Sequence, residues 1–394
     1  MEDILSQGGD REPSRWPRRL AMIGVPVLVV VASIAYLGFG RHSHSPATPA
    51  PTPANVRVSV SASADEPGGI NGTALPWAGS LRLPVAGTRP AWFSPATGRS
   101  APIGGLPADS AGYQFTRAGG GWVVRAGSGG ETESGDSVVP SLPVWFLADD
   151  AQTVTRVGTA NQVTPTARVG AVWLTTYPPT ADPDTAPRTA REVSLTGVPL
   201  GWPVRLPTGY SIYQATDRGL LLAPVSPRPG RQEYKLWNPA DPKASRTFGG
   251  VIAASPGEIA SAPSCVVACH LQLLDLATGR QAVVKLPAGS FADGAAFSPS
   301  GGFLAVLVTS DFGGGPSTRL EVASVASGRL TALPGTSVGS DTVVDFGWPT
   351  GGDSLVAEFI FPDRVQVASW HPGATGLAVA VVRPGPEQAS LVVG

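Results

Sequence analysis

Beyond about residue 75, short apolar runs alternate with turn-forming pairs of Gly, Pro, Ser, Asn and Asp. Apolar runs of four to eight residues that end at such pairs are typical of β-strands. Hardly any window of fifteen residues in this region escapes a Gly or a Pro. Each Gly costs about 1 kcal/mol and each Pro about 3 kcal/mol in a helix interior. The pattern therefore predicts many short strands joined by turns, and no long helix.

Residues 20–40 (LAMIGVPVLVVVASIAYLGFG) form the exception, because this run is apolar throughout and carries no charge. At about 1.5 Å per residue a helix of this length crosses the ~30 Å hydrocarbon layer of a bilayer. Four arginines precede the run and only Arg41 follows it closely, which places the N-terminus in the cytoplasm. A cleaved signal peptide is the alternative, but the run exceeds the usual h-region, and neither an A-x-A-like site nor a lipobox cysteine follows. We predict a single-pass membrane anchor with residues 1–19 as a cytoplasmic tail.

The stretch 41–74 is rich in Pro, Ala, Ser and Thr and has almost no large apolar side chain. It cannot bury enough surface to order itself, so we expect a flexible spacer. His42 and His44 lie in it as an H-x-H pair without a further ligand nearby, which favours solvated residues over a metal site. The rest of the chain, 75–394, is expected to be one extracytoplasmic β-domain.

A turn motif recurs in the C-terminal third of the chain. Residues 275–280 read DLATGR, residues 324–329 read SVASGR, and an ATG follows at 374–376. Their glycines are spaced by 49 and 48 residues. A period of this size indicates the blades of a propeller.

A second motif keeps the same period. Residues 297–302 (FSPSGG) precede the apolar run at 304–306, and residues 348–352 (WPTGG) precede the run at 355–357. A Pro followed by a Gly supplies first φ near −65° and then φ > 0, as a tight turn between two strands requires. Each period therefore predicts an antiparallel sheet.

These motifs resemble the β-propellers of the WD-repeat and TolB-like kind, whose blades carry an F-S-P-D-G-x-x-L-A strand-turn-strand and a D-x-x-[TS]-G-[KR] hairpin. The resemblance is clearest over about 265–380, and Ser300 stands where the family prefers Asp. It implies an all-β propeller. Extending the period back to about residue 80 adds roughly four blades to three visible ones, so we expect about seven four-stranded blades, with six or eight as alternatives.

Tryptophans recur at blade-like intervals. We expect them to pack between sheets, and a sugar-stacking platform is the alternative. The residues concerned are Trp92, Trp122, Trp145, Trp173, Trp202, Trp237, Trp348 and Trp370.

Cys265 and Cys269 are the only two cysteines. Outside the cytoplasm, an oxidising compartment favours a bridge between them, so we predict a local disulfide that pins one turn. Zinc held by these cysteines and His270 is the alternative, and it lacks an evident fourth ligand.

Candidate catalytic residues are few. Residues 335–339 (GTSVG) fit the G-x-S-x-G elbow with Ser337 at its centre, but the strand-like pattern that follows lacks the helix that an elbow requires. Outside the spacer, the histidines available as bases are His270 and His371. We therefore interpret the motif as a loop, and predict no catalytic residue, no metal and no cofactor.

Four carboxylates in expected loops are the remaining candidates, because propeller glycosidases pair acids from different blades. They are Asp149, Asp150, Asp182 and Asp184. Solvated turn residues explain them more simply, since Asp favours such positions for local hydrogen bonds.

Composition narrows the class of partner. The chain has 28 basic and 29 acidic residues, a net charge of −1, which argues against nucleic acid as a partner. Three lysines alongside 49 glycines and 40 prolines resemble the usage of high-GC actinobacteria. We expect a non-enzymatic interaction module of the cell envelope. It is held to the lipid bilayer by its helix, and it binds an envelope protein or polymer. The alternatives are a glycan hydrolase or lyase with paired carboxylates, and a sensor that signals through residues 1–19.

Overall fold

In the computed structural model, all described strands lie in one unit of the chain, residues 44–394. Its described residues are 77, 81–108, 110, 112–127, 141–178, 185–226, 233–262, 269–310, 316–339, 342–349, 352–362, 364–382 and 390–393. Within these ranges no helix is long and apolar enough to cross a membrane. The expected anchor at 20–40 and the spacer at 41–74 lie outside the described residues.

Seven sheets make up the unit, and each is named here as a blade in chain order. Blade 1 contains β29 (Ser390–Leu391), β1 (Leu83–Ala86), β2 (Ala91–Ser94) and β3 (Arg99–Pro102). Blade 2 contains β4 (Tyr113–Ala118), β5 (Gly121–Ala126), β6 (Leu142–Ala148) and β7 (Thr155–Ala160). Blade 3 contains β8 (Gln162–Pro165), β9 (Ala171–Thr176), β10 (Thr189–Ser194) and β11 (Val204–Arg205).

The remaining four blades follow the same antiparallel order. Blade 4 contains β12 (Tyr210–Thr216), β13 (Gly219–Pro224), β14 (Glu233–Asn238) and β15 (Asp241–Gly249). Blade 5 contains β16 (Val251–Ala254), β17 (Glu258–Ser261), β18 (His270–Asp275) and β19 (Gln281–Lys285). Blade 6 contains β20 (Ser290–Phe297), β21 (Phe303–Ser310), β22 (Ser317–Ser324), β23 (Leu330–Ala332) and the added β24 (Val338–Gly339). Blade 7 contains β25 (Val343–Gly347), β26 (Leu355–Ile360), β27 (Val365–Trp370) and β28 (Ala378–Val382).

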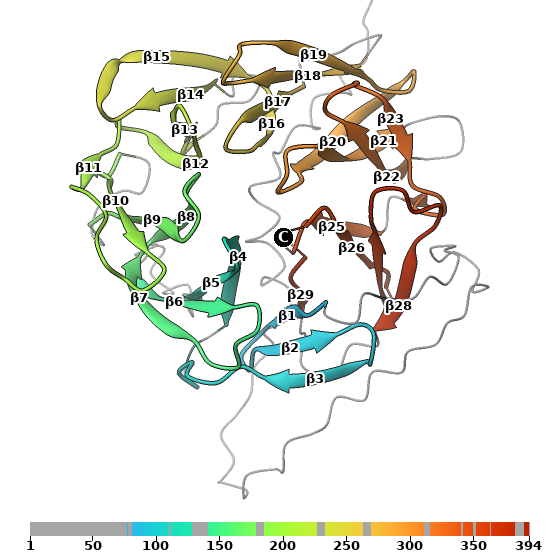
Figure 1. Cartoon of the computed structure of the whole chain (residues 1–394), viewed down its shortest axis with the longest axis horizontal. Coiled ribbons are helices and arrows are strands. Elements are labelled where there is room, and N and C mark those ends of the chain that lie inside the picture. Colours follow the sequence, from blue (N-terminus) through green and yellow to red (C-terminus); the bar gives the residue numbers. More distant parts are fainter. Residues whose placement is uncertain are drawn as a thin grey trace, which may run out of the picture. The chain divides into compact units, whose positions relative to one another are not determined.

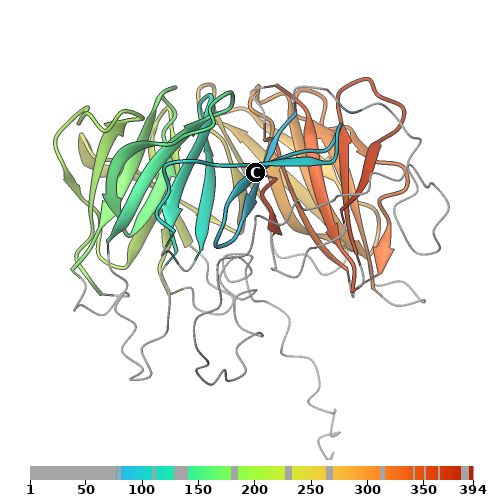
Figure 2. The same ribbon diagram turned by 90° about the horizontal axis from the view of Figure 1, so that it is seen from below.

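The blades stand in a ring with one strand of each on the inside, and the strands run roughly along the ring axis (Figures 1 and 2). This arrangement confirms the expected all-β, seven-bladed propeller of four-stranded antiparallel sheets. The ring closes in blade 1, where the C-terminal strand β29 pairs with β1 through Val85↔Leu391 and Ala86↔Ser390. The last strand of the chain is thus the innermost strand of the first blade.

The repeated turn motif forms the hairpin between the two outer strands of a blade. Gly279 (φ 72°) and Gly328 (φ 67°) occupy equivalent left-handed positions after β18 and β22. In the first copy the Oδ1 atom of Asp275 accepts hydrogen bonds from the amides of Ala277 (2.8 Å) and Thr278 (3.0 Å). The third copy differs, because the left-handed glycine between β27 and β28 is Gly373 (φ 84°).

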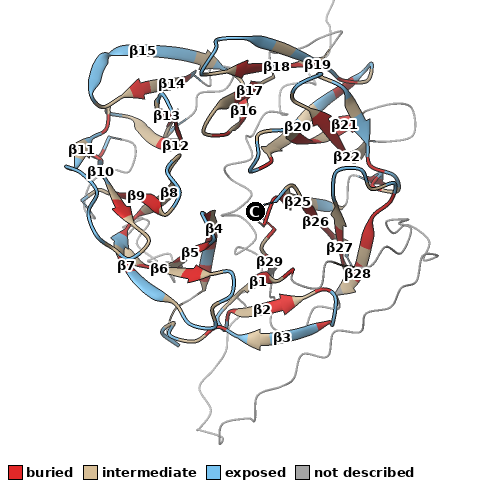
Figure 3. Ribbon diagram, viewed as in Figure 1, coloured by how far each residue is buried: buried red, intermediate tan, exposed pale blue. Residues whose placement is uncertain are grey.

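The core lies between neighbouring blades, so it consists of separate apolar clusters around the ring. Buried residues concentrate on the middle strands, while outer strands such as β15 and β19 are largely exposed (Figure 3). Five of the eight tryptophans named above are buried as expected, namely Trp92, Trp122, Trp145, Trp237 and Trp348. Trp173 and Trp370 are half-buried, and Trp202 is 90% exposed. Its side chain lies outside the core because a loop, and no strand, carries it.

Candidate functional site

The inner strands β20 and β25 of blades 6 and 7 carry polar and apolar side chains that face solvent. Asp293 and Phe291 on β20, and Asp345 and Val343 on β25, are all exposed. The two strands are neighbours, since a Cβ placed on Gly294 would lie 3.8 Å from the ring of Phe346. We call these four exposed residues the inner-strand site, in which Asp345 lies on the side of blade 1, because the next residue, Phe346, packs toward blade 6.

A β-bulge presents Asp293. The register of β20 on β21 shifts between Ala292 and Gly294, which leaves Asp293 as the extra residue. The side chain of a bulged residue points in a different direction from the side chains of the regular ladder. The Oδ2 atom of Asp293 accepts a hydrogen bond of 3.1 Å from the hydroxyl of Thr309, and that hydroxyl is 3.1 Å from the hydroxyl of Thr318. These contacts hold the carboxylate in one position.

Asp345 lies directly opposite Glu358, which is on the neighbouring strand β26. Glu358 is only 3% exposed, and its Oε1 atom accepts a hydrogen bond of 3.3 Å from the backbone amide of Leu391. Leu391 belongs to the closing strand β29. The carboxyl group of Glu358 therefore bridges the seam between blade 7 and blade 1.

Burial raises the pKa of Glu358 to about 7, because removal from water disfavours the charged form. The amide of Leu391 lowers this pKa and the charge of Asp345 raises it, both by smaller amounts. The protein surrounding Asp345 also raises the pKa of that carboxyl, although the amide of Phe346, 2.9 Å from its Oδ1 atom, lowers it. Glu358 is therefore the group of this pair whose protonation changes near neutral pH.

The loop carboxylates expected from the sequence do not gather into a site. Asp149 is ion-paired with Arg117, whose NH2 atom lies 2.7 Å from Oδ2. Asp150 is exposed in the same turn. Asp182 and Asp184 lie outside the described residues, so their separation from the other two is not tested.

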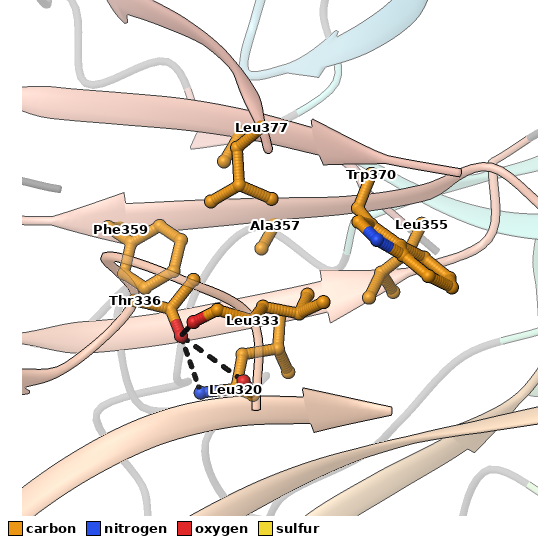
Figure 4. Close-up of a pocket in the computed structure, with 9 residues that line it drawn as sticks. Leu320, Leu333, Thr336, Leu355, Ala357, Phe359, Trp370 and Leu377 are labelled. Atoms are coloured by element: carbon orange, nitrogen blue, oxygen red, sulfur yellow. Dashed lines mark hydrogen bonds between the residues drawn. The ribbon is translucent and has the colours of Figure 1, made fainter. Parts of the chain in front are cut away.

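Ser337 is exposed in the turn between β23 and β24, and strands follow it where an elbow would need a helix. Its neighbour Thr336 is buried, and the Thr336 side chain makes hydrogen bonds. The Thr336 hydroxyl donates to the carbonyl of Leu333 (2.9 Å) and lies 3.2 Å from both the amide and the carbonyl of Leu320 (Figure 4). The motif therefore fastens a turn onto β22.

The cavity beside Thr336 is an internal packing void of about 10 Å³ between blades 6 and 7. Figure 4 shows apolar side chains converging on it, among them Phe359, Leu355 and Leu377. A cavity of this size holds about one water molecule. It is too small to bind a substrate.

The two histidines outside the spacer lie on different blades. His270 begins β18, while His371 is exposed in the turn after β27. Among the described residues, no hydrogen bond joins either imidazole to a serine or a carboxylate, and no cluster of three potential metal ligands occurs. Cys265 lies outside the described residues, so the disulfide between Cys265 and Cys269 stays a prediction.

Comparison with known proteins finds solved structures of similar fold. No family model matches the chain, and no curated protein matches it. Among solved structures, one of two prolyl endopeptidases is similar at 14% identity with a TM-score of 0.50, over 75% of this chain and 47% of that one. An acylaminoacyl peptidase from Pyrococcus horikoshii matches at 9% identity with a TM-score of 0.48, over 76% of this chain and 48% of that one. The β-propeller domain of the Trilobed protease from Pyrococcus furiosus matches at 8% identity with a TM-score of 0.47, over 73% and 88%. The chain thus spans about half the length of the first two structures.

These comparisons overturn the expectation of a non-enzymatic interaction module. The similar structure with a TM-score of 0.50 is that of a prolyl endopeptidase, which is an enzyme. The sequence could not indicate this, because a fold alone does not determine function. At 14% identity the likeness shows the fold, and the activity belongs to the proposal below.

Sequence reasoning considered acids in loops and missed the carboxylates of Asp345 on β25 and Glu358 on β26. A signal for them exists, because Glu358 interrupts the apolar run LVAEFI and Asp345 interrupts VVDFG. Glu321 gives the same signal in β22, where it is 2% exposed and ion-paired with Arg319. A charge inside a buried strand must be paired, neutralised or placed at an interface.

Proposed function

We propose that this protein is the propeller part of a peptidase system, and that it receives peptide segments for a catalytic unit outside its described residues. The inner-strand site carries the proposal. Phe291 and Asp293 on β20, and Val343 and Asp345 on β25, each combine an exposed apolar side chain with a carboxylate on an inner strand. An extended peptide with apolar and basic side chains, or a free amino terminus, complements this combination.

The likeness to a prolyl endopeptidase supports the class of ligand. That structure is described in terms of inter-domain dynamics in catalysis and specificity, and this chain matches 47% of it. A propeller joined to a catalytic part can limit which peptides reach the catalytic residues. The catalytic part would come from another domain or chain.

Peptide binding to the full chain in detergent tests the proposal. We expect fluorescent peptides that combine Phe and Lys to bind more tightly than matched peptides with Glu in place of Lys. Asp345→Asn and Asp293→Asn should weaken binding of the Lys peptides several-fold, because each removes one charge from the site. Asp150→Asn, in an exposed turn, is the matched control. Equal binding of Lys and Glu peptides would refute the proposed site.

The catalytic partner is tested separately. The tagged full chain is purified from its host, and material bound to it is treated with a fluorophosphonate probe that labels activated serine nucleophiles. We expect a labelled protein that also cleaves the Lys peptides. Bound material without any peptide cleavage would argue against a peptidase system, whatever the result with the peptides alone.

We also propose that residues 20–40 anchor the chain, with the propeller outside the cytoplasm. The charge pattern around this run supports it. The chain should stay in the membrane fraction through alkaline carbonate extraction, and protease added to intact spheroplasts should digest the propeller. Release by carbonate, or full protection from protease, would exclude this topology.

A further inference from the structure

A groove of about 370 Å³ lies between the outer strand β7 of blade 2 and the face of blade 3. Residues of β7, β9 and β10, and of the loop between β10 and β11, line it. Small-molecule sites in proteins typically occupy about 300–1,000 Å³. This groove, which we call the blade 2–3 groove, is therefore large enough for a small organic molecule, unlike the void beside Thr336.

Two glycines shape the groove. A Cβ atom on Gly158 would lie 2.9 Å from the Cδ1 atom of Leu174, so β7 lies close against β9 and the two strands form the floor. A Cβ atom on Gly197 would lie 2.7 Å from the carbonyl oxygen of Val157, so the loop after β10 touches β7 and closes one end. A side chain at either position would push the walls of the groove apart.

The loop after β10 forms the outer wall and is held by backbone contacts. The amide of Leu200 donates a hydrogen bond of 3.0 Å to the carbonyl of Glu192, and Val193 forms a β-bridge with Pro199. Pro199 and Pro203 line the groove, and their rings restrict the backbone. The groove is therefore formed in advance, so a ligand need not order the loop first.

Strand β10 directs Arg191 toward the groove. Arg191 lies opposite Leu174, which packs in the apolar cluster between blades 2 and 3. The next residue, Glu192, lies opposite Trp173, which packs on the other face of the blade against the cluster shared with blade 4. Side chains alternate along a strand, so the carboxylate of Glu192 points away from the groove.

The charge that lines the groove is positive. Arg191 is exposed and is the charged residue among those that line it. Within the described ranges, no ion pair involves Arg191. A second positive charge lies beside the groove, because β11 pairs Arg205 with the lining residue Thr189. Asp150, in the turn before β7, does not line it. An anion would therefore meet a guanidinium without a competing carboxylate on the groove's walls.

The groove also has an apolar end and a hydroxyl end. Val157 and Val193 lie toward the end that the loop closes, and both belong to the apolar cluster between the blades. Thr176 and Thr189 lie opposite each other at the other end. Arg191 lies between Val193 and Thr189 on the same face of β10. This order suits a molecule with an apolar body and an anionic group.

We propose that the blade 2–3 groove binds a small organic acid, with its apolar body along Leu174 and Val193 and its carboxylate on Arg191. A guanidinium binds a carboxylate through two parallel N–H···O hydrogen bonds, and a hydroxyl such as that of Thr189 can donate another. The apolar body leaves water on binding. This inference is independent of the peptidase proposal, because it uses a different surface.

Isothermal titration of the purified full chain in detergent, with protein-free detergent as the blank, tests the proposal. The probes are 2-naphthoate, its neutral amide 2-naphthamide, and acetate. We expect 2-naphthoate to bind at least about tenfold more tightly than either of the others. The amide lacks the negative charge, and acetate lacks the apolar body.

Four variants locate the site. Arg191→Gln should weaken 2-naphthoate binding about tenfold and leave 2-naphthamide binding unchanged, whereas a purely structural role would weaken both. Arg205→Gln should weaken 2-naphthoate binding by only about twofold, since this charge lies beside the groove and is screened by solvent. Thr189→Trp should block both probes by filling the hydroxyl end. Arg329→Gln, at an exposed arginine of blade 6, is the matched control. Melting curves verify that each variant is folded.

Four results would overturn the proposal. They are no binding of 2-naphthoate above the blank, binding that Arg191→Gln leaves unchanged, binding that Thr189→Trp leaves unchanged, and tighter binding of the cationic 2-naphthylmethylamine than of 2-naphthoate. The last result would assign the groove to a cation.

Discussion

The Oε1 atom of Glu358 accepts a hydrogen bond of 3.3 Å from the backbone amide of Leu391, and this contact joins the last blade to the strand that closes the ring. The closing strand β29 has only two residues, so few ladder hydrogen bonds hold it. The seam therefore depends on this buried carboxyl and on the apolar cluster around it. That cluster includes Leu83, Phe93, Val356, Leu391 and Val393.

Replacing Glu358 by Gln should stabilise the propeller above pH 7. The folded-state pKa of about 7 lies above the ordinary value of 4.5, so the neutral carboxyl favours folding. This stability is complete below about pH 4.5 and is lost as pH rises through about 7. Gln keeps the acceptor for Leu391 and carries no charge. At pH 9 the variant should gain on the order of 3 kcal/mol over the wild type.

Thermal melts from pH 5 to pH 9 measure this effect. The wild-type melting temperature should fall across pH 7 relative to that of Glu358→Gln, and Asp150→Asn should follow the wild type. Parallel pH profiles for the wild type and Glu358→Gln would show that the seam carboxyl does not titrate in this range.

Leu391→Ala should weaken ring closure strongly. Leu391 is 6% exposed, and truncating a buried Leu leaves a cavity that costs about 2–5 kcal/mol. The backbone amide that binds Glu358 is retained, so the lost free energy of unfolding measures the side-chain packing at the seam. Urea titration followed by tryptophan fluorescence gives the free energy of unfolding. Val169→Ala, at an exposed position, is the control, and equal losses in both variants would contradict the importance of the seam.

The number of blades could be predicted because the turn chemistry repeats. Gly279 and Gly328 need a left-handed backbone at the same place in successive blades, and the sequence shows that need directly. The composition of blade 1 could not be predicted, because Ser390 and Leu391 form a strand too short to leave a periodic pattern. These two residues become a strand only because the closed ring brings them beside β1.

The inner-strand site could not be predicted either, because it also depends on how strands pair. Asp293 is presented by a bulge, and a bulge depends on the register between β20 and β21, which no local pattern in the sequence shows. For Trp202 the sequence predicted burial where there is none. Its spacing matches that of the core tryptophans, but its loop holds it in solvent. Burial is decided by which strand or loop carries the residue.

Gly279→Ala should destabilise the protein by about 1 kcal/mol more than Gly257→Ala. A Cβ atom would meet no atom within 4 Å at either position, so steric contact is matched. Only Gly279 has a left-handed backbone, with φ of 72°. Urea titration of both variants isolates the backbone cost. Equal losses would mean that the turn after β18 relaxes without cost to another conformation.

Thr336→Val should destabilise the protein by about 1–3 kcal/mol, whereas Ser337→Ala should have almost no effect. The Thr336 hydroxyl is buried and contacts the amide of Leu320, which would lose its partner next to an apolar cavity. Ser337 is exposed and lies in a turn followed by strands. Denaturation of both variants, with peptide cleavage measured on the purified full chain and its bound partner, tests this difference. A loss of cleavage in Ser337→Ala with unchanged stability would mean that the G-x-S-x-G motif is catalytic, and that its place in a structural turn is misleading.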